Sequence, residues 1–122
     1  MVSKEAIDAA LSAHAQWKKL LQDAVSTGQS EFKVAVVRTD TGCQFGKWLH
    51  GLTQDERNSA DCGHVMELHA EFHRTAAEIL DLGLKGKKEE AMKLLGFGGA
   101  YAGISGKLVL ALHAWKKRIE QQ

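Results

Sequence analysis

The chain has 122 residues, 44% of them hydrophobic, which is enough to bury one core and predicts a single domain over residues 1–122. Its 16 Lys and Arg residues nearly balance its 15 Asp and Glu residues without forming a basic stripe, which argues against binding to nucleic acid or to an anionic membrane surface. The N-terminus lacks the pattern of a signal sequence, and no segment has about 18 uninterrupted apolar residues. We therefore expect a cytoplasmic protein, not inserted in a membrane, whose two cysteines stay reduced.

The first half of the chain is predicted to be helical, because proline is absent and Ala, Leu, Lys and Glu are abundant. A helix is predicted from about Ser3 to Ser26, with His14 and Trp17 on its apolar stripe. The sequence FKVAVV (residues 32–37) could form a short strand or an irregular crossing, and we expect a loop over the bundle. A short helix is then predicted from Thr41 to Gly51, since Thr41 and Gln44 fit a capping box and Gly51 suits a left-handed C-terminal position.

The second half is predicted to contain three further helical regions. Thr53 and Glu56 form another capping pair, and the region that they open is expected to be interrupted around residues 61–63. An apolar face then runs to about residue 80, and the last region divides into a helix to about Leu95 and another from about Gly98. The glycines at 99, 103 and 106 are predicted to permit close helix approach. Together the elements predict an all-α protein, an antiparallel four-helix bundle with an additional short helix that carries Cys43.

Two histidines have the spacing of a metal chelate. His69 and His73 lie four residues apart, which on a helix places both imidazoles on one face, about 6 Å apart along the axis. His14 lies on the stripe of the first helix and Cys43 at the start of the short one. Three imidazoles and one thiolate would fill a tetrahedral zinc shell, although the same histidines could instead be hydrogen-bonded members of a metal-free core.

Other residues with suitable chemistry have less favourable positions. Cys62 precedes His69 by seven residues, about 10 Å along a helix, so we expect it to be a small buried residue and not a ligand. His113 is expected to be a surface or hydrogen-bonded core histidine. The glycine-rich run fits neither GxGxxG nor a P-loop, which excludes nucleotide binding by these motifs. We expect the larger aromatic side chains to pack in the core: Trp17, Phe45, Trp48, Phe72 and Trp115.

Three motifs in order, HAQW (14–17), CQFGKWLHG (43–51) and HAEFH (69–73), closely resemble the chemoreceptor zinc-binding (CZB) domain family. The resemblance spans nearly the whole chain. It implies a four-helix bundle with one zinc ion per chain, held by His14, Cys43, His69 and His73. His50 stands where many relatives have an aromatic residue, and we interpret this as a neutral substitution.

The resemblance also implies a regulatory role. CZB domains are mostly attached to bacterial chemoreceptors or diguanylate cyclases, where zinc occupancy or oxidation of the zinc-bound cysteine modulates chemotaxis or cyclic-di-GMP signalling. This sequence has no methyl-accepting or GGDEF-like region, so we expect a signalling partner that acts in trans or lies outside this sequence. Family behaviour is compatible with a homodimer.

Cys43 is the residue through which a redox signal would act. A shell of four protein ligands leaves no open position for a substrate, so we expect a structural or sensing site and no enzyme. Zinc is redox-inert, whereas Cys43, near a helix N-terminus and bound to a dication, would be a thiolate that an oxidant such as hypochlorous acid converts to a sulfenic acid. The residues expected to support the site by packing are Trp17, Phe45, Gly46, Trp48 and Phe72.

Four alternatives stay open at this point. The site could report the free zinc concentration through reversible occupancy. It could be catalytic, with Cys43, His69 and His73 as ligands and water in the fourth place. Glu71 lies two residues after His69 and points to a different helix face, unlike the catalytic Glu of an HExxH motif. A hemerythrin-like di-iron centre would need more histidines and carboxylates, and Lys18 lies where a carboxylate ligand would follow His14. The chain could also be a purely structural helical interaction module.

Overall fold

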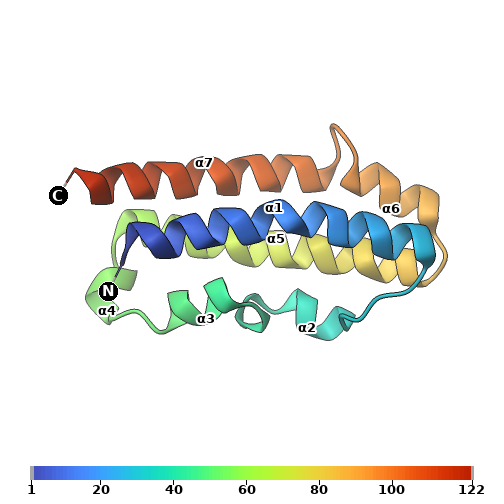
Figure 1. Ribbon diagram of the computed structural model, residues 1–122, viewed down its shortest axis with the longest axis horizontal. Coiled ribbons are helices and arrows are strands. Elements are labelled where there is room, and N and C mark those ends of the chain that lie inside the picture. Colours follow the sequence, from blue (N-terminus) through green and yellow to red (C-terminus); the bar gives the residue numbers. More distant parts are fainter. Residues whose placement is uncertain (1, 122) are drawn as a thin grey trace.

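The computed structural model describes residues 2–121, and over this range the chain forms helices and no strand, which confirms the all-α prediction. Three long helices run lengthwise beside one another, and a row of short helices lies along the opposite side from α7 (Figure 1). We call residues 34–50 the short-helix row. The helices are α1 (Lys4–Thr27), α2 (Val34–Arg38), the 3-10 turn η1 (Asp40–Gly42), α3 (Gln44–His50), α4 (Gln54–Arg57), α5 (Ala60–Leu84), α6 (Lys88–Leu95) and α7 (Ala100–Glu120).

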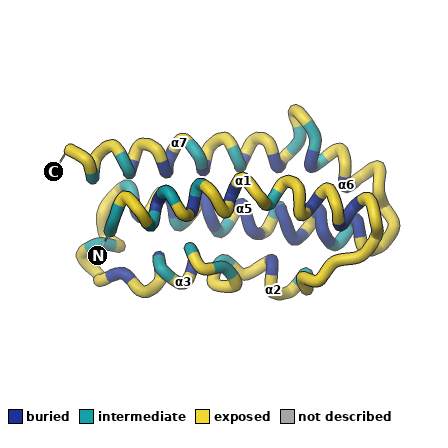
Figure 2. Tube along the Cα trace, viewed as in Figure 1, coloured by how far each residue is buried: buried dark blue, intermediate teal, exposed yellow. Residues whose placement is uncertain are grey.

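The core lies between the three long helices. Buried positions follow α5 along its whole length and the inward faces of α1 and α7 (Figure 2). These positions recur every three or four residues, so each helix turns one apolar stripe toward the others. The largest fully buried side chains include Ile7, Leu21, Phe72, Ile79, Leu80, Leu108 and Leu112. The predicted apolar faces of α1 and α5 are therefore confirmed.

Local capping explains where three of the helices begin. The Ser3 hydroxyl accepts a hydrogen bond from the backbone N–H of Ala6 and begins α1. Thr53 and Glu56 form the predicted capping box at α4. The predicted interruption at residues 61–63 is wrong, because the break lies one turn earlier, where Ser59 caps α5 by accepting from the N–H of Cys62.

The segment FKVAVV does not form the predicted loop. Residues 34–38 form α2, in which Val37 is buried and Val34 is half-buried. Valines favour strands, but no strand within residues 2–121 is available to pair with this one. One helical turn instead brings two valines, three residues apart, to the same inner face.

The short helix around Cys43 differs from its prediction at both ends. Thr41 lies in η1, and Cys43 is the N-cap of α3: its Sγ accepts a hydrogen bond from the backbone N–H of Gly46 at 3.3 Å. At the other end, Gly51 has a φ of −87°, so it is right-handed and not left-handed. The cysteine therefore begins its own helix.

The glycine-rich run separates α6 from α7, as predicted. A Cβ at Gly99 would collide with the carbonyl oxygens of Lys93 and Leu94, so this glycine is needed for the turn. At Gly103 and Gly106, however, no described atom lies within 4 Å of where a Cβ would stand. The prediction that these two glycines allow close helix approach is therefore wrong within the described chain.

The C-terminal region Lys88–Glu120 contains one window that is long and apolar enough to cross a membrane by length and composition, and 28% of this window is buried. The core helix of a soluble protein meets the same criteria. The side chains of α7 that pack inward include Tyr101, Ile104, Leu108, Leu112 and Trp115. The absence of membrane insertion stays a prediction.

Candidate metal centre

The inner face of α5 presents two imidazoles to one point. His69 and His73 lie one turn apart, and both side chains are buried. Their Nε2 atoms are 3.0 Å apart and their ring centroids 4.5 Å apart, with the rings nearly perpendicular. The predicted chelate pair is therefore in place on a long, well-packed helix.

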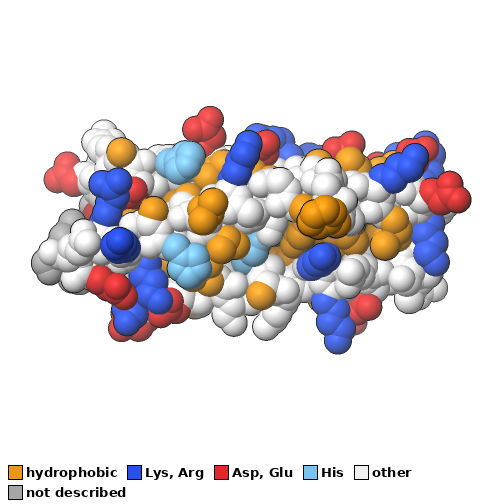
Figure 3. Space-filling model, turned by 90° about the horizontal axis from the view of Figure 1, so that it is seen from above, with side chains coloured by type: hydrophobic (Ala, Val, Ile, Leu, Met, Phe, Trp, Pro, Cys, Tyr) orange, Lys and Arg blue, Asp and Glu red, His pale blue; other side chains and the backbone are white. Residues whose placement is uncertain are grey.

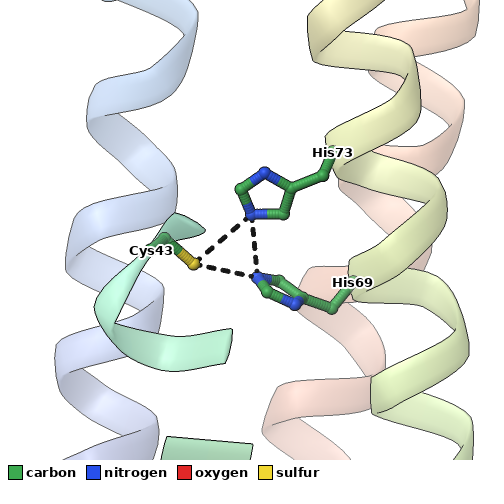
Figure 4. Close-up of side chains that lie close together, drawn as sticks. All are labelled: Cys43, His69 and His73. Atoms are coloured by element: carbon green, nitrogen blue, oxygen red, sulfur yellow. Dashed lines mark hydrogen bonds between the residues drawn. The ribbon is translucent and has the colours of Figure 1, made fainter. Parts of the chain in front are cut away.

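Cys43 reaches the same point from the short-helix row. Its Sγ lies 3.4 Å from Nε2 of His69 and 3.4 Å from Nε2 of His73, and all three side chains point toward one another (Figure 4). All three ligand atoms lie within 4.8 Å of one another. The structure thus brings together residues that are 26 and 30 positions apart in the sequence.

A backbone carbonyl of α2 determines which nitrogen of His73 carries the proton. His73 Nδ1 lies 2.8 Å from the carbonyl oxygen of Val37, and a carbonyl can only accept, so Nδ1–H donates. In the neutral ring Nε2 is then unprotonated and directs its lone pair at Cys43 and His69. Histidines that bind metals commonly have such a hydrogen bond behind them. Sequence reasoning missed Val37, because no side-chain pattern reports where a main-chain carbonyl will lie.

His14 lies near the cluster but is not one of its three members. It lines the same cavity, of about 160 Å³, as Cys43, His69 and His73. Its Nε2 is 2.7 Å from the hydroxyl oxygen of Ser105 on α7, while its buried Nδ1 has no hydrogen-bond partner among residues 2–121. The place of His14 as fourth ligand stays a prediction. Only the position of Ser105 on the inward stripe of α7 could have pointed to this contact.

The buried imidazoles are neutral at pH 7. Burial is the largest cause that lowers the pKa of His14, His69 and His73 below the ordinary value of 6.5, and for His69 it brings the pKa to about 4. The neighbouring imidazole of His73 lowers the pKa of His14 and of His69 further. Neutral imidazoles keep a free lone pair, as metal binding requires.

The predicted thiolate at Cys43 depended on a bound dication as well as on a helix N-terminus, and it stays a prediction. Burial raises the pKa of its thiol above the ordinary value of 9.0, although the N–H groups of Gly46 and Phe45 act in the opposite direction. The start of α3 alone therefore does not produce a thiolate at neutral pH. A cation beside the sulfur would be needed to remove the proton.

The donor set and its spacing fit a zinc ion. Around a tetrahedral zinc with ordinary bond lengths, a sulfur and a nitrogen ligand are about 3.6 Å apart and two nitrogen ligands about 3.3 Å apart. The observed separations, 3.4 Å for each sulfur–nitrogen pair and 3.0 Å between nitrogens, lie within a few tenths of an ångström of these values. Zinc binds well to imidazole and thiolate ligands, whereas magnesium and calcium prefer oxygen ligands.

Gly46 and the carbonyl of Asp40 hold Cys43 in position. A Cβ at Gly46 would collide with the Asp40 carbonyl and would also approach the ring of His69. The same carbonyl lies 3.7 Å from Sγ of Cys43, within reach of a weak S–H donor. The exposed side chain of His50 donates a hydrogen bond from Nε2–H to the Asp40 carboxylate at 3.0 Å. Burial raises the pKa of Asp40, but contacts that include this hydrogen bond lower it below its ordinary value.

Aromatic rings surround the cluster where packing residues were predicted. Phe45 contacts His69 edge-on at 5.2 Å between centroids, and Trp17 contacts His73 edge-on at 5.8 Å. Phe72 is buried against His14 at 4.6 Å, and Trp48 stacks on Phe45 at 5.6 Å. These rings restrict how the ligand side chains can turn.

The remaining residues of interest lie outside the cluster. Cys62 is fully buried on α5 and is not among the clustered donors, as expected of a small core residue. Burial raises the pKa of its thiol. His113 and Glu71 are exposed. The exposure of Glu71 agrees with the expectation that it points away from the two histidines.

Comparison with known proteins gives one match. A family described as the chemoreceptor zinc-binding domain matches residues 14–80, which contain His14, Cys43, His69 and His73. No curated protein and no solved structure matches the chain.

Proposed function

The chain belongs to the chemoreceptor zinc-binding domain family, and from this premise we propose that it is a regulatory domain that binds one zinc ion. The observation that carries this proposal is the convergence of Cys43 Sγ with Nε2 of His69 and His73 at 3.0–3.4 Å in the interior of the molecule. Buried imidazoles and a thiol at these separations are expected of a zinc site.

We assign His14 as the fourth ligand. Its Nδ1 is buried without a hydrogen-bond partner among the described residues, and it lines the cavity shared by the other three. If Nε2–H donates to Ser105, then Nδ1 is the nitrogen left with a free lone pair. We propose that the chain has the antiparallel four-helix bundle of the family. The three long helices would be three members of the bundle, and the short-helix row would take the place of the fourth.

The proposed signal is oxidation of Cys43. Bound zinc would supply the positive charge that holds the sulfur as a thiolate. The thiolate attacks hypochlorous acid, so that a sulfur–oxygen bond forms, the oxygen–chlorine bond breaks, and sulfenic acid and chloride result. Sulfur loses two electrons and chlorine gains them. Because Sγ also accepts the N–H of Gly46, its oxidation removes the cap of α3 and alters the start of that helix.

The consequence of this change for signalling is proposed from the family. The short-helix row would shift when Cys43 leaves the site, and a chemoreceptor or diguanylate cyclase acting in trans would detect the altered surface. The four-ligand shell leaves no place for a substrate, so we propose a role without catalysis.

Zinc occupancy itself is the second candidate signal. Cys43 is only partly buried and lies on the short-helix row, which would allow the metal to leave by opening one element. Titration of the zinc-loaded protein against chelators of graded strength separates the two candidates. A site too tight to empty at cellular zinc levels would exclude occupancy as the signal.

Metal analysis of protein purified without a histidine tag tests the zinc site. We expect about one zinc ion per chain, strongly reduced in Cys43→Ser, His69→Ala and His73→Ala, and weakened in His14→Ala. Matched controls are Cys62→Ala and His113→Ala, which should retain the ion. Retention of zinc in both Cys43→Ser and His69→Ala would contradict the proposal.

Peptide mass spectrometry after addition of hypochlorous acid in stoichiometric amount tests the redox signal. We expect the first modification at Cys43, since Cys62 is fully buried. Earlier oxidation of Cys62 or of the methionines would exclude Cys43 as the sensor while leaving the zinc site untouched.

A further inference from the structure

Three cavities follow one another along the seam between α1 and the short-helix row. The first, of about 160 Å³, lies at the histidine cluster. The second, of about 230 Å³, extends between α1 and α3 past Ala9 and Trp48. The third, of about 240 Å³, lies beside α2 and is lined by Trp17, Val36 and Cys43. Gln44 lines all three, so they form one continuous seam.

The seam contains no charged side chain, although a quarter of the residues of this chain are Asp, Glu, Lys or Arg. Besides the thiol, its polar groups are the Gln44 amide, the buried histidines and the indole N–H groups of Trp17 and Trp48. Two other cavities of the molecule differ. One is lined by Asp23 and Glu31, and the other by residues 87–90, all four of them charged. The lining of the seam therefore differs in charge from the lining of these two other cavities.

An ion that enters such a seam loses water and meets no charged side chain on its walls, whereas a small neutral molecule loses little hydration. Cys43 lines two of the three cavities and is partly buried, so a reagent approaching its sulfur from this side passes these walls.

We propose that this uncharged seam is the route to Cys43, and that it selects small uncharged electrophiles over charged or bulky ones. It admits hypochlorous acid in preference to its anion, and excludes charged disulfides. Ala13, which lines two of the cavities from α1, is assigned as a specificity-determining position. The inference rests on the proposed function only in taking Cys43 as the reacting residue.

Methanethiosulfonates test the route, because probes of different charge share one reacting group. The thiolate attacks the sulfenyl sulfur, a disulfide bond forms, and methanesulfinate leaves with the electron pair of the broken sulfur–sulfur bond. The probes are the neutral methyl, the cationic trimethylammonioethyl and the anionic sulfonatoethyl compounds. Their rates at Cys43 are measured by peptide mass spectrometry on the metal-free native chain and on the chain unfolded in urea.

For each probe, dividing the rate in the native chain by the rate in the unfolded chain cancels the intrinsic reactivity of that probe. The pKa of the thiol affects all three ratios equally, so it cancels when the probes are compared. We expect this ratio to be at least about tenfold larger for the neutral probe than for either charged probe, since only the ions must be desolvated. Equal ratios for the three probes would overturn the proposal. This test uses the wild-type chain alone, so it does not depend on a variant that folds.

Ala13→Asp places a carboxylate at the wall of the seam, and Ala15→Asp is its matched control. Both alanines are exposed on α1, but Ala15 lines none of the three cavities. We expect the cationic-to-anionic rate ratio at Cys43 to rise about tenfold in Ala13→Asp and to stay near that of the wild type in Ala15→Asp. Ala13→Lys should move the ratio the other way, and equal ratios in all these variants would contradict the assignment of Ala13.

The outcomes separate this inference from the proposed function. A chain that binds zinc but reacts alike with all three probes has the proposed site without a selective route. A chain that binds no zinc but prefers the neutral probe has the route without the proposed site.

The surface over α7 is a different environment. Figure 3 looks onto this face, where hydrophobic and charged side chains are interspersed at the surface. Charged side chains therefore lie on the surface over α7, whereas none lines the seam between α1 and the short-helix row.

Discussion

The three long helices and the short-helix row differ in what holds them in place. Each long helix has 21–25 residues and buries a continuous stripe, whereas α2, η1 and α3 have five, three and seven residues. Within the row only Val37, Gly46 and Leu49 are buried. Helices this short are not stable alone, so the row depends on its contacts with α5 and α1.

The candidate ligands are divided between these two regions. His69 and His73 lie on α5, which the core orders, while Cys43 lies on the region with the least packing of its own. A change at Cys43 can therefore move the row while the core stays folded. The following experiments test this difference, beginning with the largest expected effect.

Removal of the Phe72 ring should destabilise both regions at once. Phe72 is buried and contacts His14, Trp17 and Tyr101, so Phe72→Ala leaves a cavity at the centre of the core. We expect the free energy of unfolding of the metal-free chain to fall by about 3–5 kcal/mol in urea titrations. Phe97→Ala is the control, because Phe97 is fully exposed and its removal should change little. Similar effects of the two substitutions would contradict the assigned core.

Acid should destabilise the metal-free chain through the histidines that join the two regions. Burial lowers the pKa of His69 from 6.5 to about 4 in the folded state, so the unfolded chain takes up this proton first. The free energy of unfolding then falls as the pH drops below about 6.5, by about 3 kcal/mol from His69 once the pH reaches 4.

Unfolding titrations between pH 7 and 4.5 measure this dependence. His69→Leu should flatten the curve relative to the wild type, and His113→Leu, at an exposed position, should not. A wild-type curve no steeper than that of His69→Leu would show that His69 is not buried as a neutral ring.

Gly46→Ala should affect the short-helix row more than the core. The added Cβ collides with the Asp40 carbonyl, so η1 and α3 must separate and move Cys43. We expect zinc affinity, measured by chelator competition, to fall about 100-fold, while hydrogen exchange in α5 and α7 stays near wild type. Gly63→Ala on α5 is the control, since a Cβ there meets no atom within 4 Å. Unchanged affinity in Gly46→Ala would remove Gly46 from the support of the site.

Gly103→Ala should give the smallest effect, and a stabilising one. Gly103 lies inside α7, and a Cβ there would meet no described atom within 4 Å. Alanine in a helix interior is favoured over glycine by about 0.5–1 kcal/mol, so the thermal midpoint should rise slightly. Zinc affinity should not change. A lower thermal midpoint in Gly103→Ala would contradict this expectation, because it would mean that the added methyl group meets a neighbouring atom.

The sequence predicted the side chains of the site better than their surroundings. Cys43, His69 and His73 meet as their motifs and spacing indicated. The carbonyl of Val37, which orients His73, could not be predicted. The residues around it resembled a strand, and their helix forms because α5 offers an apolar face and no strand is present to pair with.

By itself the sequence determined the all-α class, the inward stripes of α1 and α5, the capping box at Thr53 and the candidate ligands. These follow from local rules, since helical periodicity and capping depend on residues within a few positions of one another. Tertiary structure decided that Cys43 caps α3, that Ser105 contacts His14, and that an uncharged seam leads to the sulfur. These features depend on which backbone atoms and which helix faces meet across the fold, and such contacts join positions too distant in sequence to leave a periodic signal.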